Sequence, residues 1–106
     1  MTIKKALELE GGKVYLSTNG LEAMEILKSE SIDVLVTEEM LPYQSGLNLI
    51  KICDELNIPS IIISDSDLEN KILEAFGLGA YDFIDKPYSP NELVVRTKNV
   101  LRLSMK

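Results

Sequence analysis

The sequence contains no histidine, no tryptophan and a single cysteine, Cys53, among its 106 residues. One cysteine cannot form an internal disulfide, and without histidine the usual zinc and copper ligand sets are missing. We therefore expect a protein of a reducing compartment, the cytoplasm. The chain also lacks an apolar run near the roughly 18 residues of a membrane span, and its first residues lack the apolar core of a signal peptide. We expect a soluble protein without membrane contact.

Basic residues are also scarce: 11 Lys and Arg stand against 17 Asp and Glu, which gives a formal net charge of −6. A nucleic-acid-binding surface needs clustered positive charge to neutralise phosphates. The composition therefore argues against DNA or RNA as a partner. What the chain does contain is enough apolar material for one core, 45% of the residues, in a length that suits one domain. We expect residues 1–106 to form a single domain.

Two hydrophobic patterns alternate along the chain. Short runs rich in β-branched or aromatic residues end in acids or turn residues, and stretches with helical spacing separate them. The expected strands are residues 14–16, 33–37, 61–63 and 80–84, and the expected helices are residues 3–10, 21–29, 46–57, 68–77 and 90–103. Strands that alternate with helices of this length form a parallel sheet with helices on both faces. The sequence therefore predicts an α/β fold.

Two carboxylates follow the second expected strand. The apolar residues 34–36 are followed by Thr37 and then by Glu38 and Glu39. In an open parallel sheet, ligands bind in the crevice at the carboxyl ends of the strands. Glu38 and Glu39 therefore lie where a site is expected, although a solvated surface acid is the alternative for each.

Several motifs resemble those of the receiver domains of two-component response regulators, and together they span nearly the whole chain. Residues 17–23 resemble the turn before the family's second helix, and Met40-Leu41-Pro42 with Ser45-Gly46 resemble the loop after its phosphoacceptor strand. Ser64 matches the switch hydroxyl of the fourth strand, and Phe83 matches the aromatic switch position. Lys86-Pro87 matches the invariant lysine and its cis-peptide neighbour. The resemblance implies a flavodoxin-like fold and a role in two-component signalling, with a sensor histidine kinase or an output domain as partner.

Two departures from the family pattern concern its phosphorylation site. Four residues before the loop proline the family has a phosphoacceptor aspartate, and here that position is Glu38. The extra methylene moves the carboxylate oxygens by about 1.5 Å, one carbon–carbon bond. Misplacement on this scale reduces the rate of an in-line attack by orders of magnitude. The family also binds Mg²⁺ through an acidic pair after its first strand. Residues 3–10 resemble the end of the family's first helix, so we expect this strand, the acidic pair and a bound Mg²⁺ to be absent.

The expected fold is thus a receiver truncated to about four strands and five helices. In the family's strand order the missing strand lies between residues 14–16 and residues 34–36. These segments must pair directly, be bridged by another chain, or leave an open edge that favours association. A homodimer or an exchange of strands is therefore a hypothesis. Glu38 and Glu39 are the only weak candidates for a metal.

The preferred interpretation is a pseudo-receiver that acts through protein–protein contacts and not as an enzyme. Glu38 would face Lys86 and imitate the phosphorylated state, and the contact face would be residues 67–103. Two alternatives stay open. In the first, the chain is a phosphorelay receiver whose first strand is missing from this sequence, with glutamate as a poor acceptor. In the second, it is a small α/β enzyme that uses the same crevice. No Gly-rich phosphate loop, nucleophile–base pair or histidine supports the enzyme.

Overall fold

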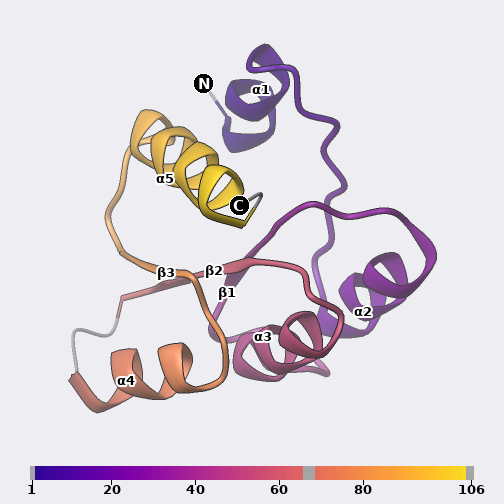
Figure 1. Cartoon of the computed structure of the whole chain (residues 1–106), viewed down its shortest axis with the longest axis vertical. Helices are drawn as coiled ribbons and strands as arrows, with labels where there is room; N and C mark the ends of the chain where they lie inside the picture. The colour runs from indigo at the N-terminus through magenta and orange to yellow at the C-terminus, as the bar shows by residue number, and fades with distance from the viewer. Residues whose placement is uncertain (1, 66–68, 105–106) are drawn as a thin grey trace.

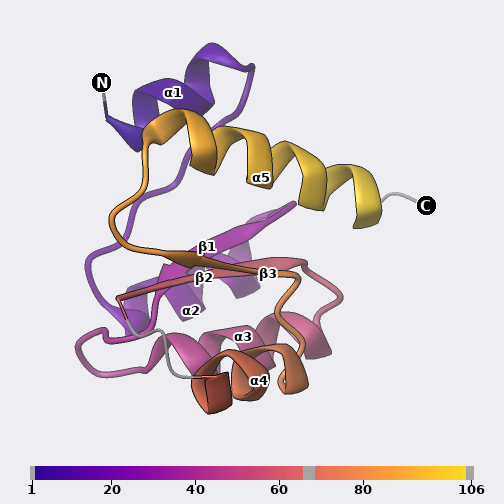
Figure 2. The same cartoon turned by 90° about the vertical axis from the view of Figure 1, so that its left-hand side faces the viewer.

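The computed structural model describes residues 2–65 and 69–104, without the side chain of residue 69. The elements in chain order are α1 (Ile3–Leu9), α2 (Gly20–Ser29), β1 (Leu35–Glu38), α3 (Gly46–Glu55), β2 (Ser60–Ser64), α4 (Glu69–Gly77), β3 (Asp82–Asp85) and α5 (Pro90–Ser104). The described strands form one parallel sheet in the order β1-β2-β3. Figure 2 shows the sheet between two helix layers, α1 with α5 on one side and α2, α3 and α4 on the other. The expected α/β class is confirmed.

The central strand β2 holds the two layers together. Residues 61–63 are buried on both faces of the sheet, as their unbroken apolar run predicts. Ile61 and Ile63 pack against Leu93 and Val100 of α5. Ile62 packs against Ile50 of α3 and Ala75 of α4 on the other face. Each of these isoleucines contributes about 2 kcal/mol by leaving water. The sheet is therefore fixed between the layers, and its strand ends have defined positions.

Helix boundaries follow from capping residues in the sequence. Asn19, Ser45 and Ser89 each accept a hydrogen bond from the backbone N–H three residues later, at 2.9, 3.1 and 3.1 Å. Beyond the end of α3, Asn57 has a left-handed φ of 60°, a conformation that asparagine tolerates well. None of the described helices has both the length and the apolar character needed to cross a membrane.

The expected strand at residues 14–16 is wrong, so the described part of the chain contains three strands and not four. This segment is extended, but it connects α1 in one helix layer with α2 in the other. In Figures 1 and 2 it passes from layer to layer beyond the edge of the sheet that β1 forms. Residues 14–16 are of types that favour β-strands, but a β-ladder also requires a neighbouring strand in the same sheet.

Candidate functional site

The carboxyl ends of the three strands form a shallow crevice of about 170 Å³. Its lining residues are Glu38, Glu39, Met40, Ile63, Ser64, Asp65 and Lys86. Because the strands are parallel, the residues that follow them meet at one edge of the sheet. The structure thus brings together four of the five site residues predicted from the sequence: Glu38, Glu39, Ser64 and Lys86.

Glu38 and Lys86 form an ion pair across the end of the sheet. Glu38 ends β1 and Lys86 follows β3, so their side chains reach over the end of β2, with Lys86 Nζ 2.6 Å from Glu38 Oε1. The backbone N–H of Lys86 donates to the Ser64 carbonyl at 3.0 Å, and this bond fixes the position of the Lys86 backbone beside the end of β2. The side chains are 40% (Lys86) and 51% (Glu38) exposed. The hydrogen bond to Glu38 raises the pKa of Lys86 above its ordinary value.

The second carboxylate of the crevice, Glu39, has partners of its own. Ser64 Oγ donates to Glu39 Oε2 at 3.1 Å, and Lys71 Nζ lies 3.6 Å from Glu39 Oε1. The Glu39 side chain is only 15% exposed, so the two contacts stabilise a carboxylate that has lost much of its water. Lys71 comes from α4, and sequence analysis missed it. The only signal was a lysine in the first turn of the helix after β2, which no motif distinguishes.

The described residues of the crevice do not fit the Mg²⁺ that the family resemblance implies. Mg²⁺ needs an octahedral set of oxygens, usually one or two carboxylates with water and phosphate. Here Glu38 is bound to a lysine, and Glu39 is bound to a lysine and a hydroxyl. Within residues 2–65 and 69–104, no group of three or more acidic or thiol side chains is arranged to hold a metal ion. Two of the three carboxylates that line the crevice, Glu38 and Glu39, pair with protein cations instead.

A tightly built loop follows β1 and fixes the position of Glu38. A Cβ on Gly46 would lie 2.0 Å from the Glu38 carbonyl oxygen, so only glycine allows α3 to begin this close to the strand end. The Pro42 carbonyl accepts from Gln44 N at 2.8 Å, which closes a turn around Tyr43 at a left-handed φ of 70°. Tyr43 is 81% exposed at the tip of this turn. A bulky residue rarely adopts this φ, so the loop carries backbone strain.

Phe83, the fifth predicted site residue, is not part of the crevice lining. Its side chain is half-buried and packs against the cluster of Ile50, Ile62, Ala75 and Ala80 on the α3 and α4 side of the sheet. This is core packing, and a switching role for Phe83 stays a prediction. The Lys86–Pro87 peptide bond is cis, as the resemblance implied.

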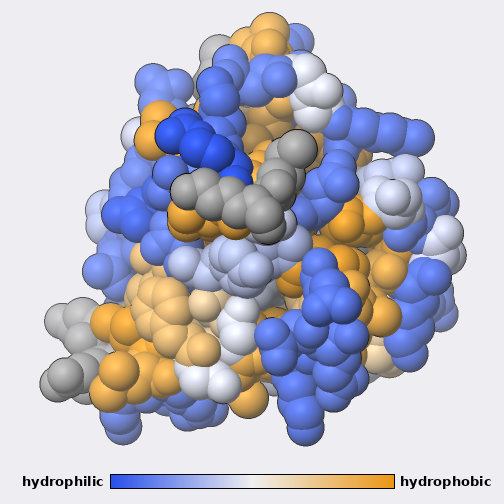
Figure 3. Space-filling model, viewed as in Figure 1, coloured by the Kyte–Doolittle hydropathy of each residue, from blue (hydrophilic) through white to orange (hydrophobic). Residues whose placement is uncertain are grey.

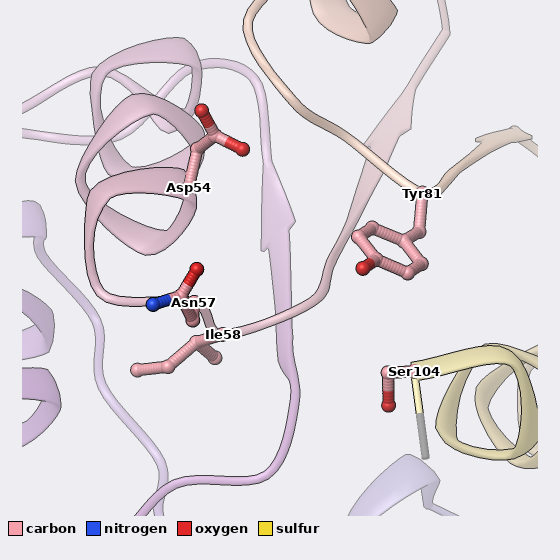
Figure 4. Close-up of a pocket in the computed structure, with 5 residues that line it drawn as sticks. All are labelled: Asp54, Asn57, Ile58, Tyr81 and Ser104. Carbon is pink, nitrogen blue, oxygen red and sulfur yellow. The ribbon is translucent and has the colours of Figure 1, made fainter. Parts of the chain in front are cut away.

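A second depression, about 240 Å³ in volume, lies at the opposite ends of the strands. Its lining residues are Asp54, Asn57, Ile58, Tyr81 and Ser104. In Figure 4 the hydroxyl of Ser104 points away from the ring of Tyr81, and it donates to the Leu101 carbonyl at 3.0 Å. The polar groups therefore do not converge on one point, and the larger depression is the less convincing site.

Comparisons with known proteins identify the family and the fold of the chain. The family model described as "Response regulator receiver domain" matches residues 1–98. Response regulator SaeR of Staphylococcus epidermidis is 41% identical over 96 residues, which are 89% of this chain and 42% of that protein. The chain thus spans less than half the length of this relative. The receiver domain of Francisella response regulator 1452 superimposes with a TM-score of 0.87 at 32% identity, covering 96% of this chain and 86% of that one. The BeF3-activated DrrB receiver domain superimposes with a TM-score of 0.85 at 25% identity, covering 94% of this chain and 85% of that one.

Proposed function

Because this chain belongs to the response regulator receiver domain family and has its flavodoxin-like fold, we propose that it is a signalling module whose crevice is set by a built-in ion pair and not by a phosphoryl group. The observation that carries the proposal is the 2.6 Å contact between Lys86 Nζ and Glu38 Oε1. In this proposal the module acts in the cytoplasm through protein–protein contacts, as a single domain, without catalysis and without nucleic acid.

The chemistry of phosphoryl transfer supports this interpretation. A carboxylate that accepts a phosphoryl group must attack in line, and a metal ion must neutralise the charge that develops. In this crevice the Glu38 oxygen is held by Lys86, and its side chain is one methylene longer than aspartate. Glu39, another of the three crevice carboxylates, is held by Ser64 and Lys71. Glu38 therefore supplies a constant negative charge next to the lysine, in partial imitation of a phosphorylated receiver.

The proposed contact face is formed by α4, β3 and α5. Large apolar side chains are exposed there: Leu73 (63%), Phe76 (44%), Tyr81 (46%) and Val95 (65%). Figure 3 shows apolar surface gathered over α4, at the lower left. Exposed apolar patches of this kind mark protein interaction sites. A sensor histidine kinase or an output domain is the partner that the family implies. Residues 67 and 68 of the expected face lie outside the described residues.

Incubation with acetyl phosphate and Mg²⁺, followed by intact-mass measurement, tests the absence of phosphorylation. We expect no stable added phosphate on this chain, and the DrrB receiver domain, which has been solved in a BeF3-activated form, serves as the comparison. A stable phosphate on the unmodified chain would falsify the proposal. Glu38→Asp identifies the cause: if the variant takes up phosphate, the length of the side chain is what prevents the reaction.

Backbone amide shifts measured by NMR test the link between the crevice and the contact face. Glu38→Gln removes the charge of the pair, and we expect shift changes that extend from the crevice to α4 and α5. Glu10→Gln is the matched control, because Lys98 Nζ also lies 2.6 Å from Glu10 Oε1, between α1 and α5. The control should shift only amides near that second pair. Changes confined to the immediate neighbours of Glu38 would contradict a signalling role for the pair.

A further inference from the structure

Among the residues that the structure describes, β1 is an edge strand that pairs on one side only. In the described sheet it pairs only with β2, and the amides of Leu35 and Glu39 donate to carbonyls on the β2 side, at 3.0 and 3.2 Å. Backbone groups alternate in direction along a parallel strand, so those of Val34 and Val36 point to the opposite side. That side carries a row of groups able to pair with another strand, and open edges of this kind promote association.

The apolar side chains of β1 are incompletely covered. Residues 34–36 are each half-buried, whereas every residue of β2 is buried. The accessible surface of the whole chain is 6748 Å². A monomer of 11.8 kDa is expected to expose about 5,900 Å². The excess of about 800 Å² belongs to the chain as a whole, and it is large enough to supply one side of a standard protein–protein interface, also about 800 Å².

The chain also carries a segment of strand-forming residues that pairs with no described strand. Residues 13–17 have no regular secondary structure, join no ladder of the described sheet, and include Tyr15 (37% exposed) and Leu16 (64% exposed). The hydroxyl of Tyr15 donates to Glu30 Oε2 at 3.3 Å, an exposed contact that is easily exchanged for another. On one side the segment is joined to α1 through Gly11, which has a φ of +90°. A free edge and a free segment on one chain satisfy the self-complementarity that a twofold dimer requires.

We propose that two copies of this chain associate at the open edge of β1, with residues 13–17 of each copy added as a strand to β1 of the other. The strand supplied in this way is apolar at residues 14–16, as the half-buried residues 34–36 require. Each copy both gives and receives a strand, so both edges close at once. This interface is separate from the crevice and from the α4, β3 and α5 face, and it does not depend on the proposed function.

A pair of substitutions with equal exposure distinguishes this interface from the other apolar face. Leu16 and Leu73 are 64% and 63% exposed, so replacing either one by lysine changes the folded monomer little. By sedimentation equilibrium we expect the unmodified chain to dimerise. Leu16→Lys should raise the dissociation constant of the dimer by about tenfold or more, and Leu73→Lys by less than about twofold. The proposal is overturned if the chain stays monomeric at all concentrations, or if only Leu73→Lys weakens the dimer.

Amide hydrogen exchange provides a second measurement that needs no variant. The Val36 amide points to the open edge, so its exchange should slow as the protein concentration rises. The Leu35 amide is the internal control, because it is bonded to the Pro59 carbonyl and should be protected at every concentration. If the Val36 amide is protected independently of concentration, the edge is covered within one chain. If it is never protected, nothing pairs there. Either result contradicts the proposed dimer.

Discussion

Replacing Glu38 by glutamine removes the negative charge of the crevice pair and keeps the shape of the side chain. Both partners are more than a third exposed, so water screens their attraction despite the 2.6 Å distance. Exposed ion pairs contribute about 0.2–1 kcal/mol to stability. We therefore expect Glu38→Gln to lower the free energy of unfolding by no more than about 1 kcal/mol, and the melting temperature by no more than about 5 °C.

Urea denaturation of the Glu38→Gln and Glu10→Gln variants in parallel is the assay. The two ion pairs have the same residue types and the same 2.6 Å distance, so the two losses of stability should be alike. Both should fade in 1 M salt, where the screening length is about 3 Å. A similar stability loss in the two variants means that any signalling defect found only in Glu38→Gln comes from the position of the charge.

The pH dependence of the pair has a defined sign. The pKa of Lys86 is raised above its ordinary 10.5 in the folded chain. A raised lysine pKa means that the stabilisation is fully present below pH 10.5 and is lost as the pH rises through the folded-state value. In an NMR titration of its side chain, Lys86 should therefore titrate at lower pH in Glu38→Gln than in the unmodified chain. An unchanged midpoint, or a stability loss above about 2 kcal/mol, would refute the reasoning, because neither fits a solvent-screened pair.

Three further predictions concern the surroundings of the site. Gly46→Ala should lower the free energy of unfolding by at least about 2 kcal/mol, because its Cβ would meet a backbone carbonyl oxygen at 2.0 Å. Gly77→Ala is the control in the same denaturation assay. Its Cβ would have nothing within 4 Å, so this substitution should be neutral or stabilising by up to about 1 kcal/mol. Tyr43→Gly should raise the melting temperature by relieving a φ of 70°, and a larger gain from Asn57→Gly at φ 60° would contradict this, since asparagine already tolerates the conformation. Cys53, whose pKa burial raises to about 12, should resist a thiol reagent at about pH 8 until urea unfolds the chain.

The residues of the crevice were largely predictable because parallel strands place their carboxyl ends together. Glu38 ends β1, where a parallel sheet predicts a site, whereas Lys86 was predicted from the resemblance to the receiver family. Lys71 was not predictable. It reaches Glu39 from a helix whose rotation about its own axis depends on how its apolar side packs.

The expected strand at residues 14–16 shows what the sequence could not predict. Val14, Tyr15 and Leu16 have strong strand preferences, but a strand exists only if a partner lies beside it in the sheet. In this chain no described strand lies beside the segment, so its backbone joins no ladder, whereas β3, which also links helices of opposite layers, lies next to β2 and pairs with it. Local composition indicates that a segment is able to pair, and only the tertiary structure decides whether it does.

The ion pair between Glu38 and Lys86 has a consequence for how a signal from this module would be controlled. A phosphoryl group is added and removed while the number of protein molecules stays the same. A glutamate side chain is made with the protein and is always within reach of its lysine, so the two groups meet without any second molecule. If the pair sets the active form, the strength of the output follows the rates of synthesis and degradation of the protein, and a cell changes it by changing copy number.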